Sequence, residues 1–131
     1  EMSKIPHTKF HELKEVFDRL HAPGGCPWDV KQTHETLIKY LREESREFIH
    51  AVRSGDYSHM QEELGDVLLQ VMFHAQIAKK NKKFDIEDVI DTLIKKLKRR
   101  HPHVFGDTKV HSARQVIINW NKIKREEKKG K

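Results

Sequence analysis

The sequence predicts an all-α protein, a helical bundle of about five helices built on an antiparallel helix hairpin. Apolar residues recur at three- and four-residue spacing along most of the chain, and residues that typically cap helices precede these stretches. Alternating patterns typical of strands are nearly absent. The 131 residues, 36% of them hydrophobic, suffice for one modest core. We therefore expect a single domain over residues 1–131.

The first expected helix is marked by a stripe of four apolar residues, Phe10, Leu13, Phe17 and Leu20. The segment APGGCPWD that follows (residues 22–29) contains two prolines and two glycines, which favours a loop. A second helix is expected from about Thr33 or His34 to Arg53. It should stop at Gly55, because glycine readily adopts the left-handed conformation that follows many helix ends.

The remaining three helices each begin at a capping residue. Ser58 and Gln61 have the spacing of a capping box, which predicts a third helix from Ser58 to about Lys80. Asp85 is a suitable N-cap for a fourth helix, which should end before Pro102. The apolar stripe of that fourth helix is Ile86, Val89, Ile90, Leu93, Ile94 and Leu97. A second capping box at residues 112–115 opens a fifth helix, whose expected buried residues are Val116, Trp120 and Ile123.

The second and third helices should form an antiparallel hairpin, because their connection around Gly55 is short. Residues at the same level of such a hairpin have numbers with a nearly constant sum. Leu37 with Phe73 and Leu41 with Leu69 share one sum. These two pairs are therefore expected to form packing layers.

The same register brings four acidic residues together. It pairs Glu47 with Glu63 and Glu44 with Asp66, and Glu44 also falls within the apolar stripe of its helix. Within each helix the two acids are three residues apart, so they project from neighbouring turns. Four unpaired carboxylates would repel one another, and Mg²⁺ with its preference for oxygen ligands would compensate them. The alternative is a solvated acidic face paired with Arg42, Arg46 and Arg53.

The third helix is apolar on two nearly opposite faces. One face carries Leu64, Leu68, Val71 and Ala75, and the other carries Leu69, Phe73 and Ile77. A helix that is apolar all round is normally buried. A chain of this length has little material with which to cover it. We therefore expect a second copy of the chain to do so, in a homodimer.

The net charge of +6 permits nucleic acid or small polyphosphates as partners. The excess positive charge lies in residues 94–100 and 122–131, whereas residues 43–66 are densely acidic, which argues against a nucleic-acid-binding face. No apolar run is long enough for a membrane span. The first ten residues lack the apolar region of a secretory signal, and the single Cys26 cannot form an internal disulfide. These features favour a cytoplasmic protein.

Five motifs occur in order along the chain: GCPWDVKQTHETL, then E-E-x-x-E at Glu43, Glu44 and Glu47, then EELGDVLLQVMFHA, RRHPHVFGD and NWNKIKREEK. Together they resemble the MazG family of all-α nucleoside triphosphate pyrophosphohydrolases over about residues 20–128, the expected core of the domain. The resemblance implies Mg²⁺-dependent hydrolysis of NTPs and dNTPs between the α and β phosphates by a helical dimer. It implies that Glu44, Glu47, Glu63 and Asp66 bind the metal, assisted by Glu43, with Mn²⁺ as a possible substitute.

The chemistry of this reaction assigns further roles. A carboxylate must orient the attacking water, and Glu47 is our first candidate and Glu43 our second. Cationic side chains must neutralise the phosphates, and each could instead be an ordinary exposed base. The candidates for phosphate binding are Lys98, Arg99, Arg100 and Lys124, with Lys39 weaker.

Aromatic and polar residues in two regions are candidates for nucleoside binding. Trp28 could stack on a base, with Asp29 and either Gln32 or His34 nearby, or it could fill a gap at the helix ends. Trp120 and Asn119 could contact the nucleotide, although Trp120 could also be a core residue.

Two other functions are compatible with the sequence. A basic helical protein could bind nucleic acid, and that binding would be sensitive to salt and insensitive to chelation of metal ions. A dimeric regulatory or interaction module could keep the metal pocket without turnover. The presence of all four acids ranks this second alternative below the enzyme.

Overall fold

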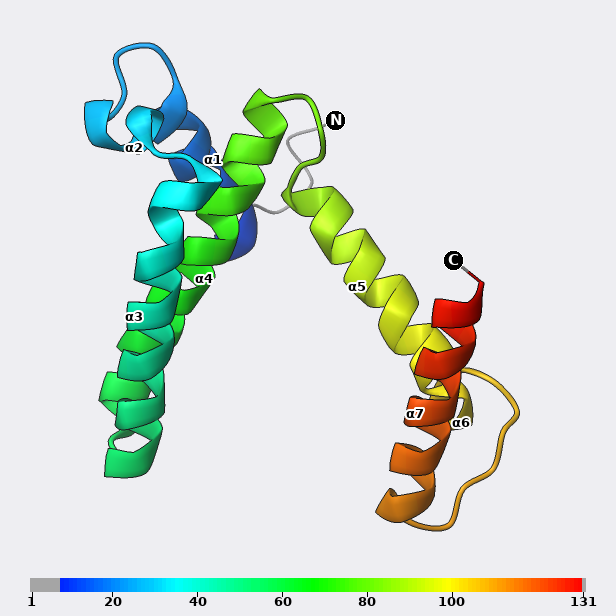
Figure 1. Cartoon of the computed structure of the whole chain (residues 1–131). Coiled ribbons are helices and arrows are strands. Elements are labelled where there is room, and N and C mark those ends of the chain that lie inside the picture. The colour runs from blue at the N-terminus through cyan, green and yellow to red at the C-terminus, as the bar shows by residue number, and fades with distance from the viewer. Residues whose placement is uncertain (1–7, 131) are drawn as a thin grey trace. The chain divides into compact units, whose positions relative to one another are not determined.

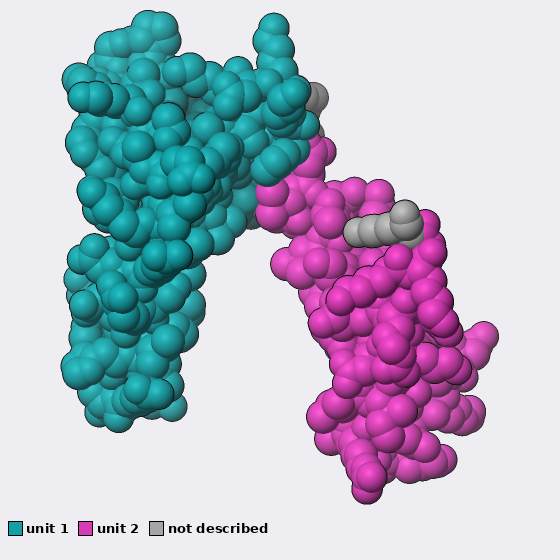
Figure 2. Space-filling model, in the orientation of Figure 1, with its two compact units in different colours: residues 1–86 teal, residues 87–131 magenta. Residues whose placement is uncertain are grey.

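The computed structural model describes residues 8–130 and divides the chain into two compact units, residues 1–86 and 87–131 (Figure 2). The described residues form seven helices and no strand, which confirms the all-α class. The two units are described separately below. Residues 1–7, which contributed to the expectation of no secretory signal, lie outside the described part.

The first unit is built from four helices, α1 (Lys9–His21), α2 (Pro27–Lys31), α3 (His34–Ser54) and α4 (Tyr57–Lys80). Helices α3 and α4 run antiparallel side by side, and α1 packs against α4 (Figure 1). The predicted hairpin is therefore present. Its turn is tight because Gly55 adopts the left-handed conformation, with φ of 71°.

Two starts of helices in this unit differ from the sequence-based expectation. The predicted loop at residues 22–29 already turns into α2 at Pro27, because proline at the first helical position has a suitable φ and lacks the N–H that would go unbonded. Helix α4 begins at Tyr57, one residue before the predicted Ser58. Its N-cap is Asp56, whose carboxylate accepts a hydrogen bond from the backbone N–H of His59 at 3.2 Å.

The core of the first unit lies around α4, which packs against both α1 and α3. Its buried hydrophobic residues are Phe17, Leu37, Ala51, Met72, Phe73, Ala75, Ile77, Ala78 and Ile86. Leu37 and Phe73 are both buried, as the hairpin register predicts. Leu41 and Leu69 are each 41% exposed, so this second pair does not form a buried layer within the single chain.

The second unit contains the rest of α5 (Ile86–Arg100), together with α6 (Pro102–Phe105) and α7 (Ala113–Lys129). Helix α5 follows Asp85 and ends before Pro102, as predicted. The short helix α6 was not predicted, and it again has proline at its first position.

Helix α7 begins after the predicted N-cap Ser112, whose hydroxyl accepts a hydrogen bond from the N–H of Gln115 at 3.2 Å. In a capping box the Gln115 side chain would accept a hydrogen bond from the N–H of Ser112. Here it accepts one from the N–H of the preceding residue, His111, at 2.7 Å. The residues expected to be buried on this helix, Val116, Trp120 and Ile123, are only half-buried in the single chain.

Candidate metal centre

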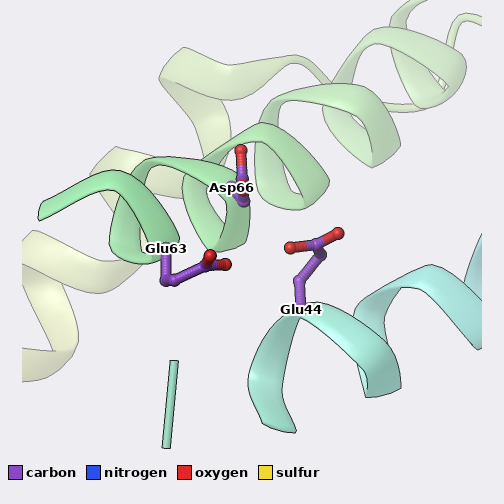
Figure 3. Close-up of side chains that lie close together, drawn as sticks. All are labelled: Glu44, Glu63 and Asp66. Carbon is purple, nitrogen blue, oxygen red and sulfur yellow. The ribbon is translucent and has the colours of Figure 1, made fainter. Parts of the chain in front are cut away.

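Three acidic side chains converge between the two helices of the hairpin. Glu44 comes from α3, and Glu63 and Asp66 come from neighbouring turns of α4 (Figure 3). One carboxylate oxygen of each residue lies within 4.8 Å of the other two. The register of the hairpin and the three-residue spacing on α4 thus place three of the four predicted ligands together.

All three acids are half-buried. Burial raises the pKa of Glu44 above its ordinary value of 4.5, and the carboxylates of Asp66 and Glu63 raise it further. The ionised forms are therefore held close together at an electrostatic cost. A hard divalent cation with oxygen ligands would offset this cost, so the donor set fits a cation of that class.

Glu47 and Glu43 lie beside this group on α3, with exposed side chains. Neither belongs to the group of three acids with converging oxygens. Both are close enough to raise the pKa of Glu44 through their charges. In the free protein, Glu43 and Glu47 are therefore solvent-accessible carboxylates next to the three converging acids.

His59 is a neighbour of the acids that the sequence analysis did not identify. Its Nε2 lies 3.2 Å from Oε1 of Glu63, and the ring of His50 on α3 lies 6.4 Å from its own ring. The signal that could have found it is the four-residue spacing to Glu63, which places both side chains on one face of α4.

Three residues predicted to bind the nucleoside lie in the first unit, Trp28 and Asp29 on α2 and His34 at the start of α3. Trp28 is 48% exposed and packs edge-on against Phe73 and Tyr40, with ring centroids 6.0 and 5.8 Å away. The ring therefore fills a gap between helices and also presents an accessible surface. Asp29 and His34 line a surface pocket.

Two polar contacts fix the environment of that pocket. Gln32, which also lines it, donates a hydrogen bond to the carbonyl of Trp28 at 3.0 Å. His34 makes a stacked contact with His74, and the two Nδ1 atoms lie 2.8 Å apart. His34 therefore already has a partner in the free protein.

The predicted phosphate-binding arginines lie in the second unit and are paired with an acid. Arg99 and Arg100 of α5 both contact Glu127 of α7, Arg100 at 2.8 Å. The hydrogen bonds from Arg100 and Arg99 lower the pKa of Glu127 to about 2. One carboxylate thus partly neutralises two guanidinium groups.

Trp120 completes this cluster. The guanidinium of Arg100 lies over its ring at 5.2 Å, a cation–π contact, and the His101 ring lies edge-on at 5.1 Å. The other predicted residues of this unit are placed as follows: Lys98 is exposed, and Lys124 and Asn119 are half-buried. The weaker candidate Lys39 lies in the first unit, where its ammonium contacts the ring of Tyr40 at 5.1 Å.

Among residues 8–130, no helix combines the length and the apolar character that crossing a membrane requires.

Comparison with known proteins identifies related chains. A family model of the MazG nucleotide pyrophosphohydrolase domain matches residues 32–105. The nucleoside triphosphate pyrophosphohydrolase/pyrophosphatase MazG of Thermotoga maritima is 55% identical over 119 residues, which are 91% of this chain and 45% of that protein. The nucleoside triphosphate pyrophosphohydrolase of Escherichia coli is 41% identical over 122 residues, 92% of this chain and 46% of that protein.

Two further comparisons concern an uncharacterised protein and a solved structure. The uncharacterised protein YabN of Bacillus subtilis is 47% identical over 125 residues, 95% of this chain and 26% of that protein. The chain thus spans less than half the length of these three relatives. The crystal structure of a mazG-related protein from Thermotoga maritima superposes with a TM-score of 0.72 and 30% identity, covering 87% of this chain and 97% of the other.

Proposed function

Because the chain belongs to the MazG nucleotide pyrophosphohydrolase domain family, we propose that it hydrolyses NTPs and dNTPs at the α–β phosphate bond. The products are the nucleoside monophosphate and pyrophosphate, and the physiological role is removal of unwanted nucleotides from the pool. The convergence of Glu44, Glu63 and Asp66 carries this proposal. Two relatives about twice as long as this chain are named as nucleoside triphosphate pyrophosphohydrolases, and their names support the proposal.

Mg²⁺ is the proposed cofactor, held by Glu44, Glu63 and Asp66, with Mn²⁺ as a substitute. Glu47 is proposed as a fourth ligand, from its exposed position on α3. These oxygen donors would suit a hard cation, a class of ion that also binds water and phosphate oxygens. When bound, the ion neutralises phosphate charge and acidifies a coordinated water.

The chain's own residues perform the remaining steps. A carboxylate oxygen of Glu47, or of Glu43 in second place, accepts the proton of the water that attacks the α phosphorus. The bond from the α phosphorus to the bridging oxygen then breaks, and that oxygen leaves with pyrophosphate. Both side chains are exposed beside the three converging acids, so they are accessible to solvent water.

The second unit supplies residue types suited to a triphosphate. Lys98, Arg99, Arg100 and Lys124 are proposed to bind phosphate oxygens, and Asn119 and Trp120 the nucleoside. Arg99 and Arg100 are paired with Glu127 in the free protein. A phosphate group would therefore compete with Glu127 for these guanidinium groups. Trp28, Asp29 and His34 are proposed nucleoside contacts in the first unit.

A homodimer is proposed to cover the apolar surface of the hairpin. Eight large hydrophobic residues on α3 and α4 are 39–53% exposed in the single chain, namely Ile38, Leu41, Ile49, Val52, Leu64, Leu68, Leu69 and Val71. Apolar surface of this extent on a small protein is typical of an interface between protein chains. We also propose a cytoplasmic location, where the thiol of Cys26 would stay reduced.

The test is incubation of the protein with each NTP and dNTP in the presence of Mg²⁺, with pyrophosphate and orthophosphate measured separately. We expect pyrophosphate, and E44Q or D66N should abolish its release while the helical CD signal stays intact. E62Q is the matched control, because Glu62 is exposed on α4 beside Glu63 and lies outside the acidic group. Release of orthophosphate alone would contradict the assigned bond.

A further inference from the structure

We propose that His59 is a positioning residue that fixes the carboxylate of Glu63 for cation binding. This inference rests on the proposed function of the acidic group. Nε2 of His59 lies 3.2 Å from Oε1 of Glu63. The two side chains are 33% and 12% exposed, so the contact is largely shielded from competing water.

The direction of the hydrogen bond follows from the chemistry of the partners. A carboxylate only accepts hydrogen bonds, so Nε2 of His59 carries the hydrogen and donates it. The bond engages one oxygen of Glu63, and the second oxygen keeps its lone pairs for a cation. A glutamate side chain has several rotatable bonds, and this contact restricts them before a ligand arrives.

The position of His59 is itself fixed from two sides. Its backbone N–H donates to the carboxylate of Asp56, the N-cap of α4, which anchors the first turn of the helix. Its ring meets the ring of His50 from α3 at 6.4 Å, with the planes 76° apart. His59 is thus held by its own helix and by the opposite helix of the hairpin.

A second pair with the same spacing shows what is particular to this one. His11 and Glu15 on α1 are also four residues apart, but Nε2 of His11 lies 3.7 Å from Oε1 of Glu15 and both side chains are more than half exposed. That pair has the character of an ordinary surface contact. The His59–Glu63 pair is shorter and more buried, and its acid belongs to the converging group.

Hydrogen bonds that orient a metal ligand typically change metal affinity about 10–100-fold when they are removed. The experiment measures Mn²⁺ binding to the whole chain by loss of the EPR signal of the free ion. H59L removes the donor and keeps a similar volume. H59N keeps a polar side chain that is too short to reach Glu63, and H59Q can place an amide donor near the position of Nε2. H11L is the matched control on α1.

We expect H59L and H59N to weaken Mn²⁺ binding about 10-fold or more, and H59Q and H11L to bind nearly as the unmodified protein does. Unchanged binding in H59L and H59N would overturn the inference, and so would equal weakening in H59Q. If H59L lost its helical CD signal, the difference in Mn²⁺ binding between H59N and H59Q would test the inference instead. Failure of the unmodified protein to bind Mn²⁺, or unchanged binding in E44Q, would instead overturn the metal site of the proposed function and this inference with it.

Discussion

The imidazole rings of His34 and His74 lie parallel, their planes 3° apart and their Nδ1 atoms 2.8 Å apart. At this distance one Nδ1 donates a hydrogen and the other accepts it, so two fully protonated rings cannot keep the contact. Burial lowers the pKa of His74 below 6.5, and the charge of His34 lowers it further. The contact therefore requires at least one neutral ring.

This pair should make the folded protein less stable in mild acid. The unfolded chain binds a proton at His74 near pH 6.5, whereas the folded chain binds it only at lower pH. The stabilisation is present above that value and is lost as pH falls through the folded pKa. Urea unfolding between pH 8 and pH 5 should show the decline, and H74Q should reduce it. An unchanged pH profile in H74Q, with H11Q as the control, would contradict this explanation.

Removing the charge of Glu44 should stabilise the metal-free protein. Burial and neighbouring carboxylates raise its pKa, so ionisation above that pKa opposes folding, and the folded state favours the protonated form as pH falls. E44Q should raise the melting temperature in EDTA by about 2–5 °C, the range for a modest gain in a chain of this size. It should also abolish any further rise on addition of Mn²⁺. E62Q should leave unchanged both the melting temperature in EDTA and its rise on addition of Mn²⁺. A melting temperature of E44Q in EDTA below that of the unmodified protein would refute the prediction.

The contact of Glu127 with Arg100 and Arg99 should contribute to stability at neutral pH and disappear in strong acid. These hydrogen bonds lower the pKa of Glu127 from 4.5 to about 2. The contribution is present above pH 4.5 and is lost as pH falls towards 2. E127Q should therefore lose less unfolding free energy than the unmodified protein over this interval, measured by chemical unfolding. E126Q, a change at the exposed neighbour, serves as the control, and equal losses in E127Q and E126Q would count against the pairing.

Two glycines should respond to alanine in opposite ways. A Cβ at position 25 would lie 2.3 Å from the carbonyl oxygen of Leu20 and 2.6 Å from that of Arg19, so the backbone must shift. G25A should destabilise by about 1–3 kcal/mol. A Cβ at Gly65 within α4 meets no atom within 4 Å, so G65A should stabilise the single chain by about 0.5–1 kcal/mol. Urea unfolding at low protein concentration measures both, and a stable G25A would contradict the close approach.

The features that could be predicted from sequence are those set by neighbours along the chain. Thr33 and Ser112 cap α3 and α7, and Gly55 ends α3 in the left-handed conformation, as residue type and spacing indicate. The convergence of Glu44 with Asp66 follows from the short turn, which fixes the hairpin register within narrow limits. Local rules therefore determine most of the first unit.

The features that sequence reasoning missed depend on small energy differences or on distant partners. Pro27 and Pro102 each open a short helix, although their segments also suit a loop. Asp56 and Ser58 are both good N-caps, and the position directly after the turn favours Asp56. The pairing of Arg100 with Glu127 joins α5 to α7, and no spacing rule relates residues that far apart.

Gly55 lies midway in the sequence between Glu44 and Asp66, so all three converging acids are contained in residues 44–66. The acids are close in sequence, and a loop as short as the one between them closes quickly during folding. We therefore expect the three carboxylates to come together as the hairpin forms, before contacts with distant parts of the chain can stabilise it. We therefore expect repulsion between these carboxylates to slow hairpin closure, and divalent cations added during refolding to speed it.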